Sequence, residues 1–415
     1  MLFVLGIVAV RNAFTYPAIG GYDAQEYISY AEGLVTRGEL PDSGVYHTPP
    51  GYPLVAGAAV ELGRRLGLSE PEHLGQLVNA LAVVITGFIV LVLARTLWPA
   101  RPVVWLAAVG FFAFLPIVLK GGAMFHPEPL AMLVSAGAAL LLARVVRRAD
   151  YSWVLALSLG LLLGLGQLVR GWSLWMVAVA VAVLGALALT HTVARRRILG
   201  FGAVVVVIAA LVPAPWYAYQ ATQYSNPVFN RPQPETFILA RRPLAFYVDA
   251  RVPDVITRPW SGRFNDRFWA VLYAETWGDY FGIWSWGTGR GERTDAIDST
   301  LTRQSLLGVL PTAIALAGLV ALLGLAIARP REDVGRLVAA LPPLAAVASV
   351  LYLAVAYPSS DGDTIKGTYA LAAAPALALC FGFAVDALAR RRVVGVVLAI
   401  VLVATALSLL PFVVW

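Results

Sequence analysis

The feature that most constrains the fold is a series of apolar stretches long enough to cross a lipid bilayer. The hydrocarbon core is about 30 Å thick, so a spanning helix needs about 20 apolar residues. The chain of 415 residues is 59% hydrophobic and only 13% charged, so lipid must surround much of its surface. We predict an all-α integral membrane protein, a polytopic bundle of about eleven transmembrane helices, over residues 2–19, 74–97, 102–119, 129–146, 153–169, 172–190, 198–217, 305–328, 337–357, 369–388 and 393–413.

The positions of the arginines predict the orientation of the bundle. With the amino terminus inside, the short arginine-rich connections all fall on one side, at residues 95–101, 144–148, 195–197, 329–336 and 390–392. The positive-inside rule makes that side the cytoplasm, which accounts for a net charge of +7 without nucleic acid as a partner. The first span is short, contains Arg11 and lacks a basic flank, so we expect the natural chain to start upstream. The protein is expected in the cell membrane, plasma or inner, as a multi-pass protein.

The opposite, extracytoplasmic side receives two long polar segments, and we expect the active site there. We divide the chain into a transmembrane module 1–218 whose external loop 20–73 carries the catalytic acid, an aromatic-rich external segment 219–303, and transmembrane helices over 304–415. Within the first loop, residues 51–67 are apolar but too short to span, which predicts an interfacial helix. The aromatic residues of the second segment fit either a belt at the headgroup level or a wall that contacts sugar or lipid.

Acids at the mouths of the predicted spans are the first candidates for chemistry, because ionisable groups are costly at the hydrocarbon edge. Asp23 and Glu26 follow the first span three residues apart, which would place them on one helix face. Asp23 could alternatively be only a helix N-cap. Glu128 opens the fourth span between Pro127 and Pro129, a pattern that also fits a simple helix start.

Two cations lie at the mouths of other spans on the same side. Arg170 opens the sixth span away from the arginine-rich connections, so it breaks the charge asymmetry. Lys366 precedes the tenth span and could either snorkel to headgroups or bind the phosphate of one particular lipid. Just before it, Asp361-Gly362-Asp363 fits a turn as well as a metal site. With Cys380 as the single cysteine, no paired Cys/His spacing suggests zinc.

Five short motifs on the predicted outer side connect these residues to a known family. They are Asp23 with Tyr27 and Ala31, Pro49-Pro50-Gly51-Tyr52-Pro53, Pro127-Glu128, the run from Gly164-Leu165 to Arg170, and Lys366 with Tyr369 and Pro375. Their order resembles that in the GT-C glycosyltransferases that use polyprenyl-phosphate sugars, the superfamily of protein O-mannosyltransferases and the lipid A aminoarabinose transferase. Ala24 stands where many members have the second acid of an Asp-Glu pair, and the last motif is loosened to Lys-Gly-Thr-Tyr.

The resemblance implies a GT-C bundle that transfers a sugar from a polyprenyl-phosphate donor to an acceptor hydroxyl, with inversion. A phosphate leaving group needs no general acid, so one carboxylate base suffices, and Asp23 is our candidate. Glu128 would orient the acceptor or hold a cation. Charge on the departing phosphate needs fixed cations, for which the candidates are Lys366, Arg170, Lys120 and Arg263. Contacts to acceptor or sugar are expected from Glu26, His47, Tyr52, His126, Tyr369 and Trp277.

The expected partners are a polyprenyl-phosphate sugar, the lipid bilayer, and a glycan, glycolipid or protein acceptor. A divalent cation is a candidate cofactor, and we expect the prenyl chain in a groove beside the interfacial helix 51–67. A lipid-linked glycan polymerase or ligase of related fold would share these residues. A transporter or flippase, the alternative from another class, predicts ionisable residues at mid-depth or broken helices; we expect neither in the spans, apart from Arg11.

Overall fold

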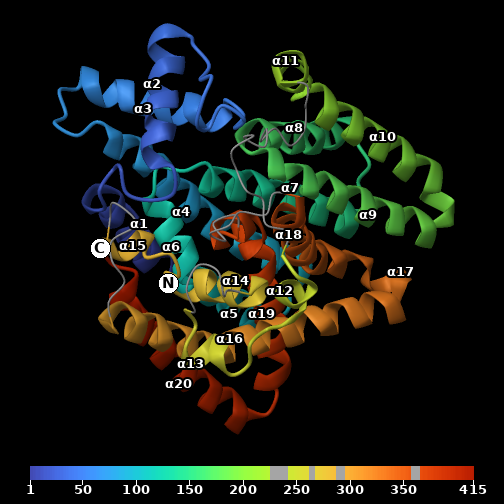
Figure 1. Cartoon of the computed structure of the whole chain (residues 1–415). Helices are drawn as coiled ribbons and strands as arrows, with labels where there is room; N and C mark the ends of the chain where they lie inside the picture. Colours follow the sequence, from blue (N-terminus) through green and yellow to red (C-terminus); the bar gives the residue numbers. More distant parts are fainter. Residues whose placement is uncertain (225–241, 261–266, 287–294, 357–364) are drawn as a thin grey trace.

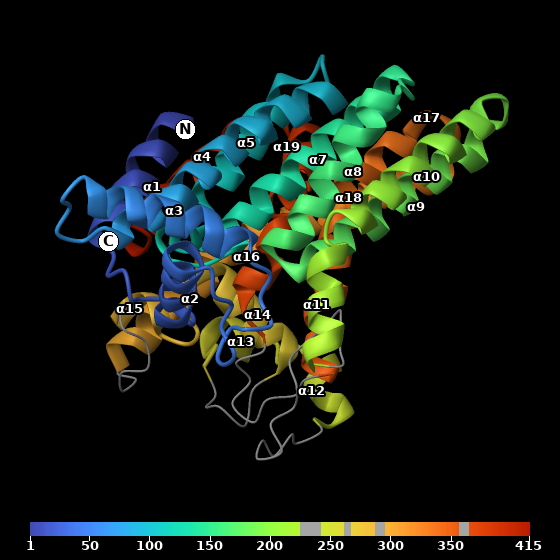
Figure 2. The same ribbon diagram turned by 90° about the horizontal axis from the view of Figure 1, so that it is seen from above.

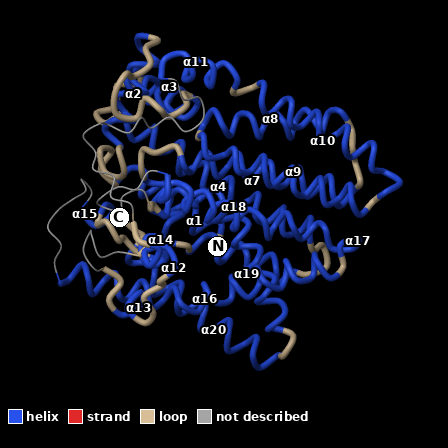
Figure 3. The backbone as a smooth tube through the Cα atoms, turned by 45° about the vertical axis from the view of Figure 1, so that its right-hand side comes forward, coloured by secondary structure: helices blue, strands red, loops and turns tan. Residues whose placement is uncertain are grey.

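The computed structural model describes residues 1–224, 242–260, 267–286, 295–356 and 365–415 (Figure 1). These residues form helices and loops, and none of them is in a strand (Figure 3). The first half of the chain contains α1 (Leu2–Thr15), α2 (Ala24–Arg37), α3 (Gly51–Arg65), α4 (Glu72–Leu97), α5 (Pro102–Phe114), α6 (Pro116–Ala123), α7 (Glu128–Arg148), α8 (Trp153–Val169), η1 (Gly171–Ser173), α9 (Leu174–Thr190), η2 (Thr192–Ala194), α10 (Arg195–Leu211) and α11 (Ala214–Tyr224).

The second half contains short helices and then four long ones. They are α12 (Leu244–Val248), α13 (Asp254–Thr257), α14 (Phe268–Trp277), α15 (Ile283–Trp286), α16 (Asp295–Ala328), α17 (Pro330–Asp333), η3 (Val334–Arg336), α18 (Leu337–Ala356), η4 (Gly367–Ala373), α19 (Ala374–Ala389), α20 (Arg392–Leu409) and η5 (Leu410–Phe412).

The predicted spans correspond to helices, but not all of them are long straight ones. Within the described residues, seven segments are long and apolar enough to cross a membrane: α4, α7, η1 with α9, α16, α17 through α18, η4 with α19, and α20 through η5. α5 with α6 and α10 with α11 add two bent pairs, while α1 and α8 are apolar but shorter. The structure therefore confirms an all-helical chain with seven to nine candidate spans. A total of eleven stays a prediction.

The two bent pairs differ from the unbroken helices that we expected. α5 and α6 meet at 51°, and α10 and α11 at 46°. Pro116 is the first residue of α6, and Pro213 and Pro215 flank the start of α11. Proline lacks the backbone N–H and its ring blocks the preceding turn, so a sharp bend is expected at each of these places.

Small residues let the central helices pack closely. A Cβ atom added at Gly318 of α16 would overlap the backbone carbonyl of Cys380 in α19, and one added at Gly382 would lie 2.5 Å from the carbonyl oxygen of Val104 in α5. Such close backbone approach is typical of helix contacts in membranes. α19 thus joins α5 and α16 at the centre of the bundle.

The polar elements gather at one end of this bundle. In Figure 2, α2 and α12–α15 lie at one end, and the α4–α5 and α9–α10 connections and α17 lie toward the other. The stretch 51–67 is helical over α3, which packs against α2 around buried Tyr27 and Tyr52. That α3 lies at the membrane interface stays a prediction. We call the first end the α2 end; it holds the candidate site.

Candidate active site

Asp23 and Lys366, which are 343 positions apart in the sequence, form an ion pair at the α2 end. The Lys366 ammonium donates to Asp23 Oδ2 at 3.2 Å. Asp23 occupies the N-cap position of α2, yet its side chain makes no capping hydrogen bond. Its backbone is left-handed, with φ of 54°, an uncommon conformation that aspartate tolerates better than most residues. The side chain is therefore directed to Lys366 rather than used to cap the helix.

The Asp23 carboxylate is both ionised and accessible. Burial raises its pKa, but the ammonium of Lys366 and the nearby His126 and Arg170 lower it more, so the pKa falls to about 2. About 44% of the Asp23 side chain is exposed, against 8% for Lys366. An open carboxylate thus faces a buried ammonium.

Arg170 and Glu128 form a second, fully enclosed ion pair. Arg170 Nε donates to Glu128 Oε1 at 2.7 Å, and the residues are only 6% and 2% exposed. Arg170 Nη1 also donates to Tyr27 OH at 3.0 Å and to Thr48 Oγ1 at 3.2 Å. The guanidinium therefore ties the start of α7 and the end of α8 to α2 and the loop before α3.

Tyr369 connects the two ion pairs. Its ring centroid lies 5.3 Å from Arg170 Cζ and 5.7 Å from Lys366 Nζ. Both distances are within the range of cation–π attraction. The two predicted cations therefore lie on one aromatic ring, and the predicted Tyr369 belongs to the same cluster.

His126 completes this group of residues. It is 2% exposed, and its ring centroid lies 5.2 Å from that of Tyr27 and 6.4 Å from that of Tyr22. Burial lowers the pKa of His126 well below its usual range, and the charges of Arg170 and Lys366 lower it further. Neither ring nitrogen has a hydrogen-bond partner among the described residues. A neutral imidazole with both nitrogens unpaired is unusual in a folded interior.

The remaining predicted residues contact other parts of the structure, except Tyr52, whose ring packs edge-on against that of Tyr27 with centroids 6.3 Å apart. Lys120 Nζ donates to the Gly278 carbonyl at 2.9 Å, next to α14. Trp277 donates to Thr312 Oγ1 at 2.7 Å, and Tyr52 is fully buried, with its hydroxyl accepting from Asn79 Nδ2 at 3.1 Å. The His47 ring packs edge-on against Tyr46, with centroids 5.6 Å apart. Arg263, like Asp361 and Asp363, lies outside the described residues.

Sequence reasoning missed Glu275, which lies in α14 and is 2% exposed. Tyr22 OH donates to its Oε2 at 2.5 Å. Burial raises the pKa of Glu275 to about 7, and Asp279 adds to this rise. The only sequence signal was an acid inside the aromatic run Phe268–Trp277.

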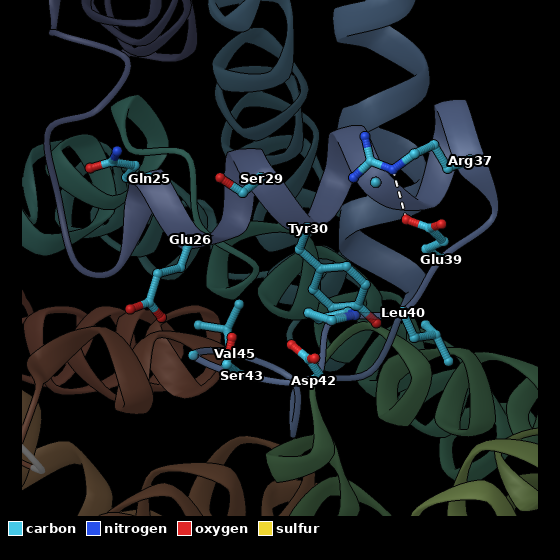
Figure 4. A pocket seen from close by; sticks show the side chains of 13 residues that line it. Gln25, Glu26, Ser29, Tyr30, Arg37, Glu39, Leu40, Asp42, Ser43 and Val45 are labelled. Atoms are coloured by element: carbon cyan, nitrogen blue, oxygen red, sulfur yellow. Dashed lines mark hydrogen bonds and ion pairs between the residues drawn. The ribbon is translucent and has the colours of Figure 1, made fainter.

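Sequence neighbours of Asp23 and Lys366 line two cavities. An apolar cavity of about 650 Å³ lies among α14, α16, α18 and η4, and its lining includes Trp277 and Gly367, the residue after Lys366. A polar cavity of about 690 Å³ runs along α2. Figure 4 shows Glu26 extending from α2 toward the segment that carries Ser43 and Val45. Glu26 lies three residues after Asp23.

The groups around Asp23 do not form a set of metal ligands, because its charged neighbours are cations. Among the described residues, no group of three or more His, Cys, Asp or Glu side chains could hold a metal. The groups that act on Asp23 are the cations Lys366 and Arg170 and the imidazole of His126, which is neutral. A divalent cation bound here would have to displace these groups.

Comparison with known proteins supports the fold prediction. A family model described as dolichyl-phosphate-mannose-protein mannosyltransferase matches residues 49–219. The apo crystal structure of the Archaeoglobus fulgidus oligosaccharyltransferase matches with a TM-score of 0.58 and 13% identity, over 100% of this chain and 54% of that chain. The same archaeal enzyme, AglB, in complex with an inhibitory peptide and a dolichol-phosphate matches with a TM-score of 0.58 and 12% identity, over 98% of this chain and 54% of that one.

A weaker match, with a TM-score of 0.44 and 16% identity, is ArnT from Cupriavidus metallidurans in the apo state, over 94% of this chain and 77% of that chain. No curated protein sequence matches the chain. This chain spans about half the length of the oligosaccharyltransferase that it resembles. That structural likeness shows that this chain shares the fold of the oligosaccharyltransferase, which is consistent with the predicted GT-C fold.

Proposed function

We propose that this GT-C protein is a membrane glycosyltransferase that transfers a sugar from a polyprenyl-phosphate donor to an acceptor hydroxyl, with inversion. The observation that carries the proposal is the ion pair of an accessible Asp23 carboxylate and a buried Lys366 ammonium at 3.2 Å. Sequence neighbours of the two residues line an apolar cavity (Gly367) and a polar cavity (Gln25 and Glu26). The family match and an oligosaccharyltransferase structure with bound dolichol-phosphate support a lipid-linked donor.

The donor is proposed to bind with its phosphate at Lys366 and its prenyl chain in the apolar cavity. Gly367 lines that cavity, so the head of the lipid would reach the neighbouring ammonium. Arg170, which also contacts the Tyr369 ring, adds positive potential. Its Nε and Nη1 already donate to protein groups. In a low-dielectric site such fixed cations stabilise a phosphate more than they do in water.

The acceptor is proposed to reach Asp23 along the polar cavity on α2. Asp23 removes the proton of the acceptor hydroxyl while its oxygen attacks the anomeric carbon, and the bond from that carbon to the phosphate oxygen breaks. The electrons of this bond leave with the polyprenyl phosphate, which Lys366 stabilises. A bound donor phosphate also interacts with the Lys366 ammonium and so weakens the stabilisation of the Asp23 carboxylate by Lys366. The pKa of Asp23 therefore rises, and Asp23 becomes a stronger base.

His126 and Glu128 are proposed to support the bound sugar. The buried, unpaired nitrogens of His126 suit a sugar hydroxyl, since buried polar groups normally have a partner. Glu128 holds Arg170, and through it Tyr27 and Thr48.

We also propose that all eleven predicted stretches cross or enter the membrane and that the α2 end faces the extracytoplasmic side. In this orientation, residues 219–303 form an external segment between the transmembrane modules 1–218 and 304–415. Nucleotide sugars are absent there, so a lipid-linked donor is the form in which an activated sugar can arrive.

Cysteine labelling checks this orientation. Because Cys380 is the single cysteine and is buried, a Cys380→Ala background permits single-cysteine variants. Ser43→Cys, at the α2 end, is expected to react with a membrane-impermeant maleimide in intact cells, whereas Thr192→Cys should react only after permeabilisation. Both positions are exposed. The reverse pattern would contradict the orientation.

The function itself is tested by incubating purified protein with a panel of radiolabelled polyprenyl-phosphate sugars and candidate acceptors. Consumption of one donor with label transferred to an acceptor is expected, and a chelator arm reports any metal requirement. Movement of a labelled lipid across proteoliposomes without its consumption would instead favour a flippase. Formation of long polymers would favour the glycan polymerase alternative.

A further inference from the structure

Glu275 is a buried acid next to the site that the proposed reaction does not use. It accepts a hydrogen bond from Tyr22 OH at 2.5 Å through Oε2, and one from the Phe281 backbone N–H at 3.1 Å through Oε1. The side chain is 2% exposed. Burial of a carboxylate costs free energy unless hydrogen bonds compensate it. Because both oxygens of Glu275 accept hydrogen bonds, its side chain is held in one position.

The first contact connects Glu275 to both members of the Asp23–Lys366 pair. Tyr22 directly precedes Asp23, the residue with the left-handed backbone. The Lys366 ammonium lies 4.7 Å from the centroid of the Tyr22 ring. A shift of Tyr22 would therefore move the carboxylate and alter the surroundings of the ammonium.

A second, separate contact runs through Gly367. A Cβ atom at Gly367 would lie 2.9 Å from Glu275 Cβ and 3.1 Å from its carbonyl carbon. The backbone that follows Lys366 thus packs directly on Glu275. Glu275 contacts the neighbour of Asp23 on one side and the neighbour of Lys366 on the other.

We propose that Glu275 is a positioning residue for the transfer: its ionised carboxylate holds Tyr22, and its Cβ and backbone support Gly367. Together these contacts fix the Asp23 carboxylate and the Lys366 ammonium in their reactive arrangement. Glu275 acts through these two neighbours and not on the substrate. This inference rests on the proposed glycosyl transfer.

The charges around Glu275 predict a pH dependence. Burial and Asp279 raise the pKa of Glu275 to about 7, against the opposing effects of Tyr22, the Phe281 N–H and Lys120. The pKa of Asp23 is about 2 and that of His126 is well below its usual range, so neither titrates near neutrality. An ionised carboxylate accepts a stronger hydrogen bond than a protonated one. Transfer should therefore increase as the pH rises through about 7.

The test compares kcat and donor KM of the wild type and Glu275→Gln between about pH 5.5 and 8.5. Gln keeps an acceptor for Tyr22 but does not titrate. We expect a wild-type kcat that rises with an inflection near pH 7. Glu275→Gln should lack this inflection and have a kcat about 10-fold below the wild type at high pH, with little change in donor KM.

Tyr22→Phe provides the matched variant, because it keeps the ring under Lys366 and removes only the hydroxyl. It should reproduce the loss of Glu275→Gln, and the double variant should lose no more than either single one. A wild-type pH profile and kcat in Glu275→Gln, or losses that multiply in the double variant, would overturn the inference while leaving the function standing. A wild type that transfers no sugar from any donor would refute the proposed function, and the inference with it.

Discussion

Asp23→Asn is expected to lower kcat for sugar transfer by about 10²–10⁴-fold, the usual contribution of a general base. Asparagine is nearly isosteric and tolerates the left-handed backbone that Asp23 adopts, so the fold should persist. Asn removes the negative charge that lies 3.2 Å from the Lys366 ammonium, which makes the ammonium more attractive to a phosphate. Binding of unsugared polyprenyl phosphate should therefore stay equal or become tighter. Radiolabel transfer and lipid binding measure the two effects.

The matched control is Glu32→Gln on the same helix. Glu32 pairs with Arg64 at 3.0 Å and lies outside the site, so its replacement should leave transfer within about twofold of the wild type. Transfer by Asp23→Asn at the rate of this control would remove Asp23 as the base.

Arg170→Met is expected to reduce the stability of the folded protein by about 3–5 kcal/mol, because it leaves the buried Glu128 carboxylate without a counter-charge. The variant also removes the hydrogen bonds to Tyr27 and Thr48. The double variant Glu128→Leu/Arg170→Met replaces both charges with apolar groups and should recover much of the loss. Thermal unfolding in detergent, compared across the three proteins, measures the order of stability.

A surface pair supplies the control for this second prediction. Arg65 and Glu61 of α3 lie 2.9 Å apart, but the Arg65 side chain is 76% exposed, so Arg65→Met should cost less than about 1 kcal/mol. If the double variant were as unstable as Arg170→Met alone, the unpaired charge would not be the cause.

The helices could be predicted from the sequence because each apolar stretch matches the thickness of a bilayer. The details that follow from packing could not. Pro116 is visible in the sequence, but whether it bends a span or only starts a new helix depends on how α5 and α6 pack against their neighbours. Likewise, the 14 residues of α1 reach only about 21 Å at 1.5 Å per residue.

The candidate site was predicted as a set of charges at helix mouths, without their partners. A single sequence does not indicate that Asp23 meets Lys366 or that Glu128 meets Arg170, because both contacts join distant parts of the chain. Glu275 escaped notice because its burial depends on how α14 packs against η4 and Tyr22. The prenyl groove expected beside α3 stays a prediction, and the structure adds an apolar cavity among α14, α16, α18 and η4, lined in part by Gly367.

The most direct test is a structure of the protein with a polyprenyl-phosphonate sugar, a donor whose bond to the anomeric carbon does not break. We predict a phosphonate oxygen within hydrogen-bond distance of Lys366 Nζ and the prenyl chain in the cavity lined by Trp277. The Asp23 carboxylate should face the anomeric carbon from the side opposite the phosphonate. A phosphonate bound away from Lys366, or Asp23 on the same side as the leaving group, would contradict the account.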